Sequence, residues 1–305
     1  MRSGAPAALA VLWAIAAGAA PLPSSPAFIS IPTEELQQNY DTLWAVSDVH
    51  GRRKQLEKLL RAAGIAARNS GEMSWKSAQG RQLFIVVGDC IRGGPDSRGV
   101  VLLLKKLQDE AAAAGSRVVV LLGNKEVEFL ADPLRFREDE FSRLIRTMPV
   151  AAVVGSWLFA HAGYIDAQDD PDALRDYFVR AGEGWSAGKY DFFLQRHSIL
   201  EYHNWWKSER RRSKLKERLA TLGLNGLVFG HDPDGLGAPR TLAMDAGGWL
   251  IKLDTGLKEG ASHGMMLRCE VSRIVRGTQL AMSENGKPIC RALMPDGEVR
   301  ELPVH

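Results

Sequence analysis

The sequence predicts an α/β fold that contains a layer of parallel strands. Three short apolar runs, at residues 43–46, 83–87 and 118–122, have the composition of buried strands. A turn and a segment with helical spacing follow each of them. Because three strand–loop–helix units in succession are typical of a parallel sheet covered by helices, we expect such a sheet in the first half of the chain.

The helices of these units are predicted from the spacing of their hydrophobic residues. After the first strand, leucines recur at helical spacing over residues 56–60, among basic and polar residues. After the second strand, valine and leucine residues over 100–107 have the same period. A shorter helix at 126–130 should follow the third strand and end before Pro133, because the residue that precedes a proline disfavours the helical conformation.

The second half of the chain has a different pattern. Residues 150–154 and 157–160 are typical of two strands joined by a Gly-Ser turn. Residues 166–222 are polar, charged and aromatic, which favours a helical insertion, and 227–229 is a further buried strand. From Thr241 onward, short alternating strands and Gly-rich turns suggest a second sheet packed on the first.

The composition excludes disordered and fibrous proteins. Of the 305 residues, 45% are hydrophobic and 25% are charged, which is ordinary for a globular chain. Lys and Arg total 39 and Asp and Glu total 36, so the net charge of +3 gives no reason to expect nucleic acid or an anionic membrane as the main partner. The basic run at 210–218 contains Glu217 and lies in a helical region, so we interpret it as a solvent-facing helix.

The first residues have the pattern of a secretory signal peptide. Arg2 is the only charged residue before Glu34, residues 5–20 are small and apolar, and a Pro-rich stretch follows. We therefore predict a signal peptide at 1–20, a linker at 21–40 and a secreted or periplasmic protein. The alternative is an uncleaved membrane anchor, although the apolar run is shorter than the roughly 20 residues that span a bilayer.

Export would place the three cysteines in an oxidising compartment. Cys269 and Cys290 flank an alternating stretch and could pair across strands, but two free buried thiols are an equally good interpretation. Cys90 lies inside a candidate metal motif and is expected to stay unpaired. Three cysteines without a CxxC pair provide neither a disulfide scaffold nor a zinc ribbon.

Each of five predicted strands is followed by side chains that can bind a metal ion. In chain order they are Asp48, His50, Asp89, Asn124, His161 and His231. In open α/β sheets, ligands bind at the C-terminal ends of the strands, so we expect these side chains to converge on one edge. A single histidine after a strand is more often a packing residue, but repetition at five strand ends indicates a metal centre.

The set of ligands suits two metal ions. Asp48 and His50 would hold one ion, the asparagine and the two later histidines would hold the other, and Asp89 would bridge them. Nitrogen and oxygen ligands without thiolate favour Mn, Fe or Zn over Ca or an iron–sulfur cluster. The bridging position would hold a water acidified to hydroxide, a nucleophile suited to in-line attack on phosphorus.

The residues at the strand ends form the ordered motifs D-x-H-G, G-D, G-N-x-E, H-A-G and G-H, which resemble those of the calcineurin-like metallophosphoesterase superfamily. The stretches G-D-x(5)-P-D-S, W-L-F-A-H-A-G and L-D-T-G are similar to its serine/threonine phosphoprotein phosphatase branch, and most of all to the bacterial and Shewanella-like types. The resemblance covers residues 43–267. It implies a domain at 41–305 with a four-layer α/β/β/α sandwich over a dinuclear site, a helical cap inserted at about 166–222, and metal-ligand roles for the six residues above.

Residues beside the metal ligands depart from the family pattern. Where the family has G-D-x-x-D-R-G-P, this chain has Arg92 for the second aspartate and Gly93 for the arginine that binds phosphate. Lys125 stands where the family has the histidine that protonates the leaving group. A similarity within the insertion places His203 in the position of another phosphate-binding arginine. The metal ligands are complete, whereas the acid–base and phosphate-binding residues are changed.

We therefore expect a phosphoesterase with an altered general-acid site that hydrolyses phosphomonoesters or phosphoanhydrides, in a phosphorylated small molecule or a phosphoprotein. Lys125 could still donate a proton or act as a fixed cation, and Arg92 could reach the phosphate with altered geometry. Because loss of a general acid affects poor leaving groups most, activity should be weak on phosphoserine and better on aryl esters, phosphotyrosine or phosphoanhydrides. The alternative is a pseudophosphatase whose extra cations, with His203, hold a phosphate or partner without turnover.

Overall fold

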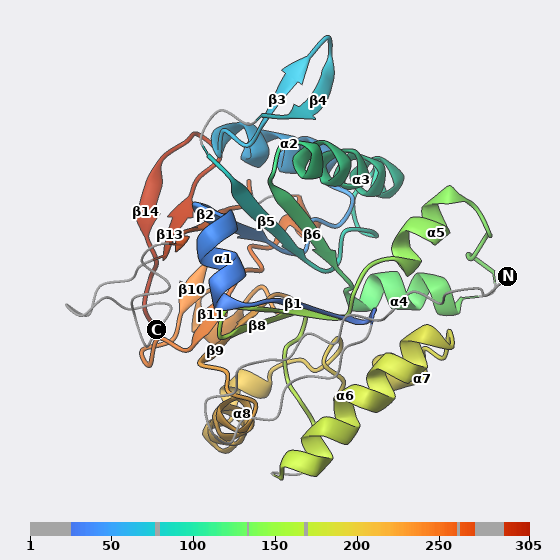
Figure 1. Ribbon diagram of the computed structural model, residues 1–305, viewed down its shortest axis with the longest axis vertical. Helices are drawn as coiled ribbons and strands as arrows, with labels where there is room; N and C mark the ends of the chain where they lie inside the picture. Colours follow the sequence, from blue (N-terminus) through green and yellow to red (C-terminus); the bar gives the residue numbers. More distant parts are fainter. Residues whose placement is uncertain (1–25, 77–79, 133, 168–169, 261–262, 272–289) are drawn as a thin grey trace, which may run out of the picture.

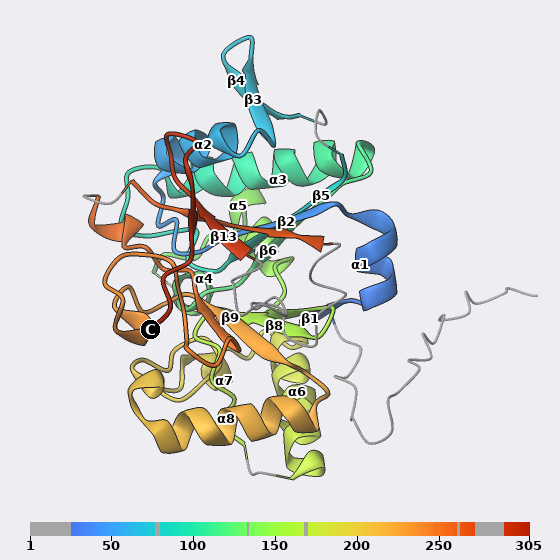
Figure 2. The same ribbon diagram turned by 90° about the vertical axis from the view of Figure 1, so that its left-hand side faces the viewer.

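Most of the strands are buried and lie in two sheets, and helices cover the outer face of each sheet. Figure 1 shows the resulting order of helices, sheet, sheet and helices, and the turned view in Figure 2 shows the same order. The computed structural model describes residues 26–76, 80–132, 134–167, 170–260, 263–271 and 290–305. The expected four-layer α/β/β/α sandwich is confirmed.

The first sheet has the strand order β14-β13-β12-β2-β5-β6. Its strands are β2 (Thr42–Val46), β5 (Gln82–Val87), β6 (Arg117–Leu121), β12 (Met266–Glu270), β13 (Cys290–Leu293) and β14 (Val299–Glu301). The neighbours β2, β5 and β6 are parallel, as their strand–loop–helix order predicts. The three C-terminal strands extend the sheet in antiparallel register, beginning with Leu267 opposite Ala45.

Two helices cover the outer face of the first sheet. They are α2 (Arg53–Ala62) and α3 (Ser97–Ala113), the helices predicted after the first and second strands. Because side chains alternate along a strand, Trp44 of β2 packs in the cluster that contains Leu56 of α2, whereas Leu43 belongs to the cluster between the sheets. A hairpin formed by β3 (Ala66–Asn69) and β4 (Glu72–Trp75) projects beyond α2 in both views.

The second sheet has the strand order β1-β7-β8-β9-β11-β10. Its strands are β1 (Phe28–Ile31), β7 (Ala151–Val154), β8 (Trp157–Ala160), β9 (Gly226–Phe229), β10 (Ala243–Met244) and β11 (Leu250–Lys252). The predicted strands at 150–154, 157–160 and 227–229 therefore all belong to this sheet. The neighbours β8 and β9 are parallel, so their C-terminal ends lie together.

Two parts of the sheets differ from the expectations drawn from the sequence. The strands after Thr241 do not form a sheet of their own, because β10 and β11 join the second sheet while β12, β13 and β14 join the first. The stretch expected to be a linker, 21–40, contains β1 and the helix α1 (Thr33–Asn39), and β1 pairs in parallel with β7. Which neighbour a short strand pairs with depends on distant segments, so a local pattern does not indicate it.

Helices from the expected insertion at 166–222 cover the outer face of the second sheet. They are α6 (Pro171–Ser186), α7 (Asp191–Leu194), the 3₁₀ turn η1 (Trp205–Lys207) and α8 (Glu209–Thr221). Phe178 of α6 and Leu215 of α8 are fully buried in one apolar cluster with Leu158 and Leu227 of the sheet. The remaining helical segments are α4 (Asn124–Ala131), α5 (Glu140–Arg146), η2 (Gly235–Gly237) and η3 (Leu257–Glu259).

A disulfide joins Cys269 of β12 to Cys290 of β13, which are direct partners in the antiparallel register. The structure thus decides between the two interpretations of these cysteines, and Cys90 is a buried free thiol. The predicted signal peptide at 1–20 lies outside the described residues. In the described part of the chain, no helix combines the length and the apolar character that crossing a membrane requires.

Replacing both bridged cysteines, in the variant Cys269→Ser/Cys290→Ser, should lower the free energy of unfolding by about 3 kcal/mol. The bridge joins residues 21 positions apart, so its loss gives the unfolded chain more conformational freedom. Denaturant unfolding of parent and variant, with and without a thiol reductant, measures this difference. The reductant should destabilise only the parent, and an equal response of the two proteins would show that the bridge does not stabilise the fold.

Candidate metal centre

The six side chains predicted to bind metal lie where the C-terminal ends of strands from both sheets meet. The first sheet contributes those that follow β2, β5 and β6, and the second sheet contributes those that follow β8 and β9. They are Asp48, His50, Asp89, Asn124, His161 and His231. Each of these residues is at most 8% exposed, so the centre lies inside the sandwich rather than on its surface.

Asp48, His50 and Asp89 form a first group of facing atoms. Nε2 of His50 lies 3.7 Å from Oδ1 of Asp48 and 3.5 Å from Oδ2 of Asp89. Nδ1 of the same ring donates to the carbonyl oxygen of Arg92 at 2.7 Å, which directs Nε2 toward the two carboxylates. One atom from each of the three residues lies within 4.8 Å of the others, a spacing that can hold a single metal ion.

A second group surrounds the other oxygen of Asp89. Nε2 of His161 lies 3.3 Å from Oδ1 of Asp89, 3.2 Å from Oδ1 of Asn124 and 3.0 Å from Nδ1 of His231. The two oxygens of Asp89 therefore face different groups. The two groups share this one carboxylate.

Backbone carbonyls set the tautomers of the histidines in the second group. Nδ1 of His161 donates to the carbonyl of Val87 at 3.2 Å, and Nε2 of His231 donates to that of Glu201 at 3.1 Å. In the neutral rings, the remaining nitrogens then carry lone pairs that face each other. Burial lowers the pKa of both histidines, so protonation does not relieve this repulsion at neutral pH. Facing acceptor atoms of this kind fit a bound cation.

The first group has the opposite electrostatics. Burial alone would lower the pKa of His50, but the carboxylates of Asp48 and Asp89 outweigh burial and raise this pKa to about 9. Burial, together with the neighbouring carboxylates of Glu126 and Asp48, raises the pKa of Asp89 well above its ordinary value. When no metal ion is bound, the raised pKa values of His50 and Asp89 both favour protonation of this first group.

The chemistry of the donor atoms agrees with the expected metals. The two groups offer imidazole nitrogens, carboxylate oxygens and one amide oxygen, a mixture that suits Mn, Fe or Zn. Cys90 follows Asp89 directly, but burial raises the pKa of its thiol well above the ordinary value, which disfavours the thiolate needed for ligation.

Four of the ligands have a left-handed backbone conformation. The angle φ is 54° at Asp48, 48° at His50, 49° at Asp89 and 69° at His231. Non-glycine residues rarely adopt this conformation, and such strain persists where the surrounding structure and a functional site require it. The sharp turns after β2, β5 and β9 therefore direct ligand side chains inward at a local energetic cost.

Glu126 holds together the turns that carry the ligands of the first sheet. Its buried carboxylate accepts hydrogen bonds from the backbone nitrogens of Asp89 at 3.0 Å, Ile91 at 3.1 Å and Gly123 at 2.7 Å. These nitrogens belong to the turns after β5 and β6. One side chain thus sets the position of Asp89 relative to Asn124, and the motif G-N-x-E contains the residue responsible.

Glu128, one helical turn after Asn124 on α4, pairs with Lys125 and Arg92, which both depart from the family pattern. Nζ of Lys125 lies 2.6 Å from one oxygen of Glu128, and the guanidinium of Arg92 pairs with the other oxygen. Nδ2 of Asn124 also donates to Glu128, at 3.3 Å, which directs Oδ1 of Asn124 toward His161. Lys125 and Arg92 therefore do not form an uncompensated pair of cations.

His203 and Asp232 form a hydrogen-bonded pair beside the second group. Nδ1 of His203 donates to Oδ1 of Asp232 at 2.7 Å, and the other oxygen accepts from the backbone nitrogen of Asn204 at 2.8 Å and from Nε1 of Trp206 at 2.9 Å. The ring of His203 stacks on that of His231, with centroids 3.7 Å apart. The His203 side chain is 51% exposed, so the pair lies at the mouth of the centre.

Three carboxylates at the centre were not identified from the sequence: Glu128, Glu201 and Asp232. Asp232 follows a predicted ligand directly, and Glu128 lies one helical turn after Asn124, so spacing could have indicated both. Glu201 offers no such signal, because it is far along the chain from every predicted ligand. The fold alone brings it next to His231.

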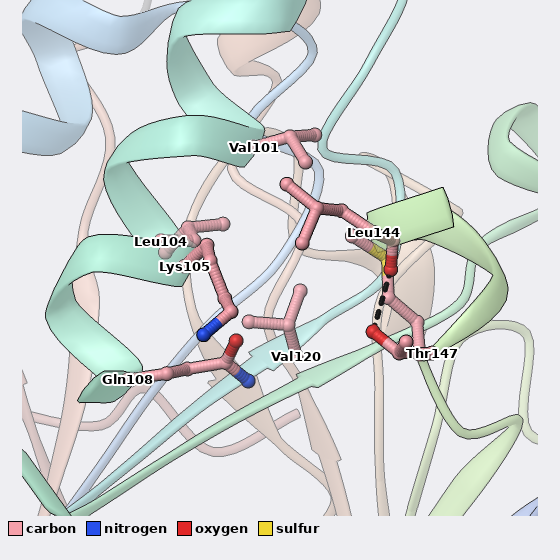
Figure 3. A pocket seen from close by; sticks show the side chains of 8 residues that line it. Val101, Leu104, Lys105, Gln108, Val120, Leu144 and Thr147 are labelled. Atoms are coloured by element: carbon pink, nitrogen blue, oxygen red, sulfur yellow. Dashed lines mark hydrogen bonds between the residues drawn. The ribbon is translucent and has the colours of Figure 1, made fainter. Parts of the chain in front are cut away.

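A small cavity lies apart from these ligands, between α3, β6 and α5 (Figure 3). Val101, Leu104 and Leu144 are among the residues that line it. Its volume of about 20 Å³ has room for one water molecule. None of the six predicted ligands lines the cavity, and it is too small to hold a substrate.

Known proteins resemble this chain in sequence and in fold. The model of the calcineurin-like phosphoesterase family matches residues 42–235. An uncharacterised protein of Schizosaccharomyces pombe is 26% identical over 260 residues, which are 73% of this chain and 75% of that protein. Shewanella-like protein phosphatase 2 of Arabidopsis thaliana is 30% identical over 118 residues, which are 38% of this chain and only 28% of the plant protein. The crystal structure of a cold-active protein-tyrosine phosphatase from a psychrophilic Shewanella has a TM-score of 0.65 at 18% identity, with 92% of this chain and 83% of that chain covered.

The variant Glu126→Gln should lower the free energy of unfolding of the metal-free protein by about 2 kcal/mol. The amide group would present a donor to backbone nitrogens that need an acceptor. Chemical denaturation measures the effect, and Glu209→Gln on the exposed start of α8 is the matched control, expected to unfold like the parent. If Glu126→Gln were as stable as this control, the carboxylate would not hold the turns together.

Proposed function

Because the chain belongs to the calcineurin-like phosphoesterase family, we propose that it is a dinuclear, metal-dependent phosphoesterase with an altered general-acid site. The family match and the similarity to a Shewanella-like phosphatase confirm the resemblance that the motifs indicate. The observation that carries the proposal is the pair of ligand groups that share Asp89. We propose that the reaction is hydrolysis of phosphomonoesters or phosphoanhydrides.

The chain would hold one ion with Asp48, His50 and Asp89, and the other with Asp89 and the ligands of the second group. Divalent Mn, Fe or Zn bound there would supply an acidified water for attack and positive charge for the phosphoryl oxygens. The backbone nitrogen of Lys125 donates to Oδ1 of Asp89 at 3.0 Å, and that of His231 donates to Oδ2 of Asp48 at 2.9 Å. These bonds hold both carboxylates in place before a substrate arrives.

His203 is the residue that we propose to protonate the leaving group. The position of the family's general acid is occupied by Lys125, which pairs with Glu128. His203 has the carboxylate partner that this role requires, because its Nδ1–H is held by Asp232. Nε2 is then the atom that would carry the proton, and stacking on His231 keeps the ring beside the second group.

Lys125 and Arg92 would bind the phosphoryl oxygens less strongly than the family's arginine. Both already pair with Glu128, whose single negative charge offsets part of their positive charge before a phosphate enters. This pairing also weakens the case for a pseudophosphatase, which would need free cations to hold an anion without turnover. A phosphorylated substrate would be bound mainly through the metal ions.

The leaving group sets the substrate class that we propose. With an altered general acid, aryl phosphates, phosphotyrosine and phosphoanhydrides should react faster than phosphoserine, because their leaving groups need less protonation. The Shewanella protein that shares the fold is a protein-tyrosine phosphatase, which agrees with an aryl leaving group.

We further propose that the protein works outside the cytoplasm after cleavage of its signal peptide. The disulfide between Cys269 and Cys290 supports this location, because such bonds persist in oxidising compartments.

The metal-loaded protein should hydrolyse an aryl phosphate, and Asp89→Asn should reduce kcat/KM by about 100-fold or more, because the shared side chain loses its negative charge and one of its two ligand oxygens. Lys125→His should raise activity, since a histidine there would have Glu128 as a nearby carboxylate. Steady-state kinetics with p-nitrophenyl phosphate and with a phosphoserine peptide measures both effects. Absence of turnover in both the parent and Lys125→His, with metal bound, would favour the pseudophosphatase. A hundredfold preference for the phosphoserine peptide over p-nitrophenyl phosphate would contradict the leaving-group argument.

The variant His203→Gln should lower activity on the phosphoserine peptide by about 100-fold and change activity on the aryl phosphate little, because only the alkyl leaving group needs the proton. Asp232→Asn should show the same pattern more weakly. Comparison of kcat/KM for the two substrates is the measurement. Equal losses on both would assign His203 to phosphate binding instead, the role of the arginine that it replaces in the family.

A further inference from the structure

Glu201 lies next to the second group of ligands and has no role in the function proposed so far. It belongs to the segment that connects α7 to η1, and its backbone carbonyl accepts the hydrogen bond that sets the tautomer of His231. Burial raises the pKa of its carboxyl group, and the nearby side chain of Asn124 acts in the opposite direction. Glu201 is therefore in contact with two ligands of the same group, through its backbone and through its side chain.

One oxygen of this carboxylate lacks a partner. Oε2 of Glu201 is buried and has no hydrogen-bond partner among the residues that the structure describes. A buried carboxylate oxygen without a partner is unfavourable, so such atoms are rare unless a ligand completes them. The neighbouring carboxylates differ: Glu126 accepts from backbone nitrogens, Glu128 pairs with Lys125 and Arg92, and Asp232 pairs with His203.

The nearby cations do not complete Glu201. Nζ of Lys125 is 2.6 Å from Glu128, and Nδ1 of His203 is held by Asp232. The second group, one of whose histidines contacts the backbone of Glu201, contains acceptor atoms that also face one another without a cation. A single bound cation could satisfy both the unpartnered oxygen of Glu201 and these acceptor atoms.

We propose that the carboxylate of Glu201 is a further ligand of the second metal ion, in addition to the ligands that the sequence motifs identify. This inference rests on the proposed function, because it assumes that a divalent ion binds the second group. A second carboxylate there would strengthen the binding of an oxygen-preferring ion such as Mn²⁺. It would also attach the segment between α7 and η1, which carries His203, to the metal centre.

Isothermal titration of the metal-free protein with Mn²⁺ tests this proposal. The parent should bind two ions, and Glu201→Gln should weaken one site by about 10- to 100-fold while the other site keeps its affinity. Glutamine retains an oxygen that can accept from Asn124, so loss of affinity in this variant would point to the charged oxygen and not to the orientation of Asn124. Glu209→Gln, which removes an exposed carboxylate from α8, should bind both ions like the parent.

Thermal unfolding of the same proteins separates the possible failures. Without metal, Glu201→Gln should melt at or above the melting temperature of the parent, because the variant removes a buried charge that has no partner. Addition of Mn²⁺ should raise the melting temperature of the variant less than it raises that of the parent. Two unchanged Mn²⁺ affinities in Glu201→Gln would overturn this inference alone. A parent protein that binds no Mn²⁺, Fe²⁺ or Zn²⁺ would overturn the proposed function itself.

Discussion

The buried carboxylate of Asp89 is the group on which the rest of the centre depends. One of its oxygens faces His50 and the other faces His161, so the distance between the two ligand groups is set by the size of a single carboxylate. The turn that carries it is held by Glu126, whose carboxylate binds backbone nitrogens of two separate turns. Packing of the sheets brings the groups together, but this shared side chain decides how far apart they lie.

The two ligand groups differ in how they tolerate the absence of a metal ion. In the first, His50 can hold a proton between the carboxylates of Asp48 and Asp89, as its raised pKa indicates. In the second, the nitrogens of His161 and His231 face each other without a proton, because burial lowers the pKa of both rings. Metal binding would therefore displace a proton from one group and relieve repulsion in the other, and both effects link the ions to the stability of the fold.

The altered residues at the mouth show how charge can be rearranged around an unchanged ligand set. Lys125 and Arg92 replace a histidine and an aspartate of the family, and Glu128 pairs with the two cations that result and offsets one of their charges. A histidine–carboxylate pair is nevertheless present at another place, where His203 donates to Asp232 and stacks on a ligand. Under the function that we propose, this pair supplies from a different segment the proton transfer that the family places at position 125.

The sequence by itself determined the parallel strands of the first sheet and the residues that could bind metal, because apolar runs and the polar residues after them are local features. It did not determine which sheet the strands after Thr241 join, or that residues 28–31 form β1, because strand pairing depends on distant partners. The contacts of Arg92 with Glu128, of His203 with Asp232 and of Glu201 with His231 also join residues that are far apart along the chain. Only the tertiary structure decided these, because hydrogen bonds and charge pairs depend on distances in space, whereas a sequence records separation along the chain.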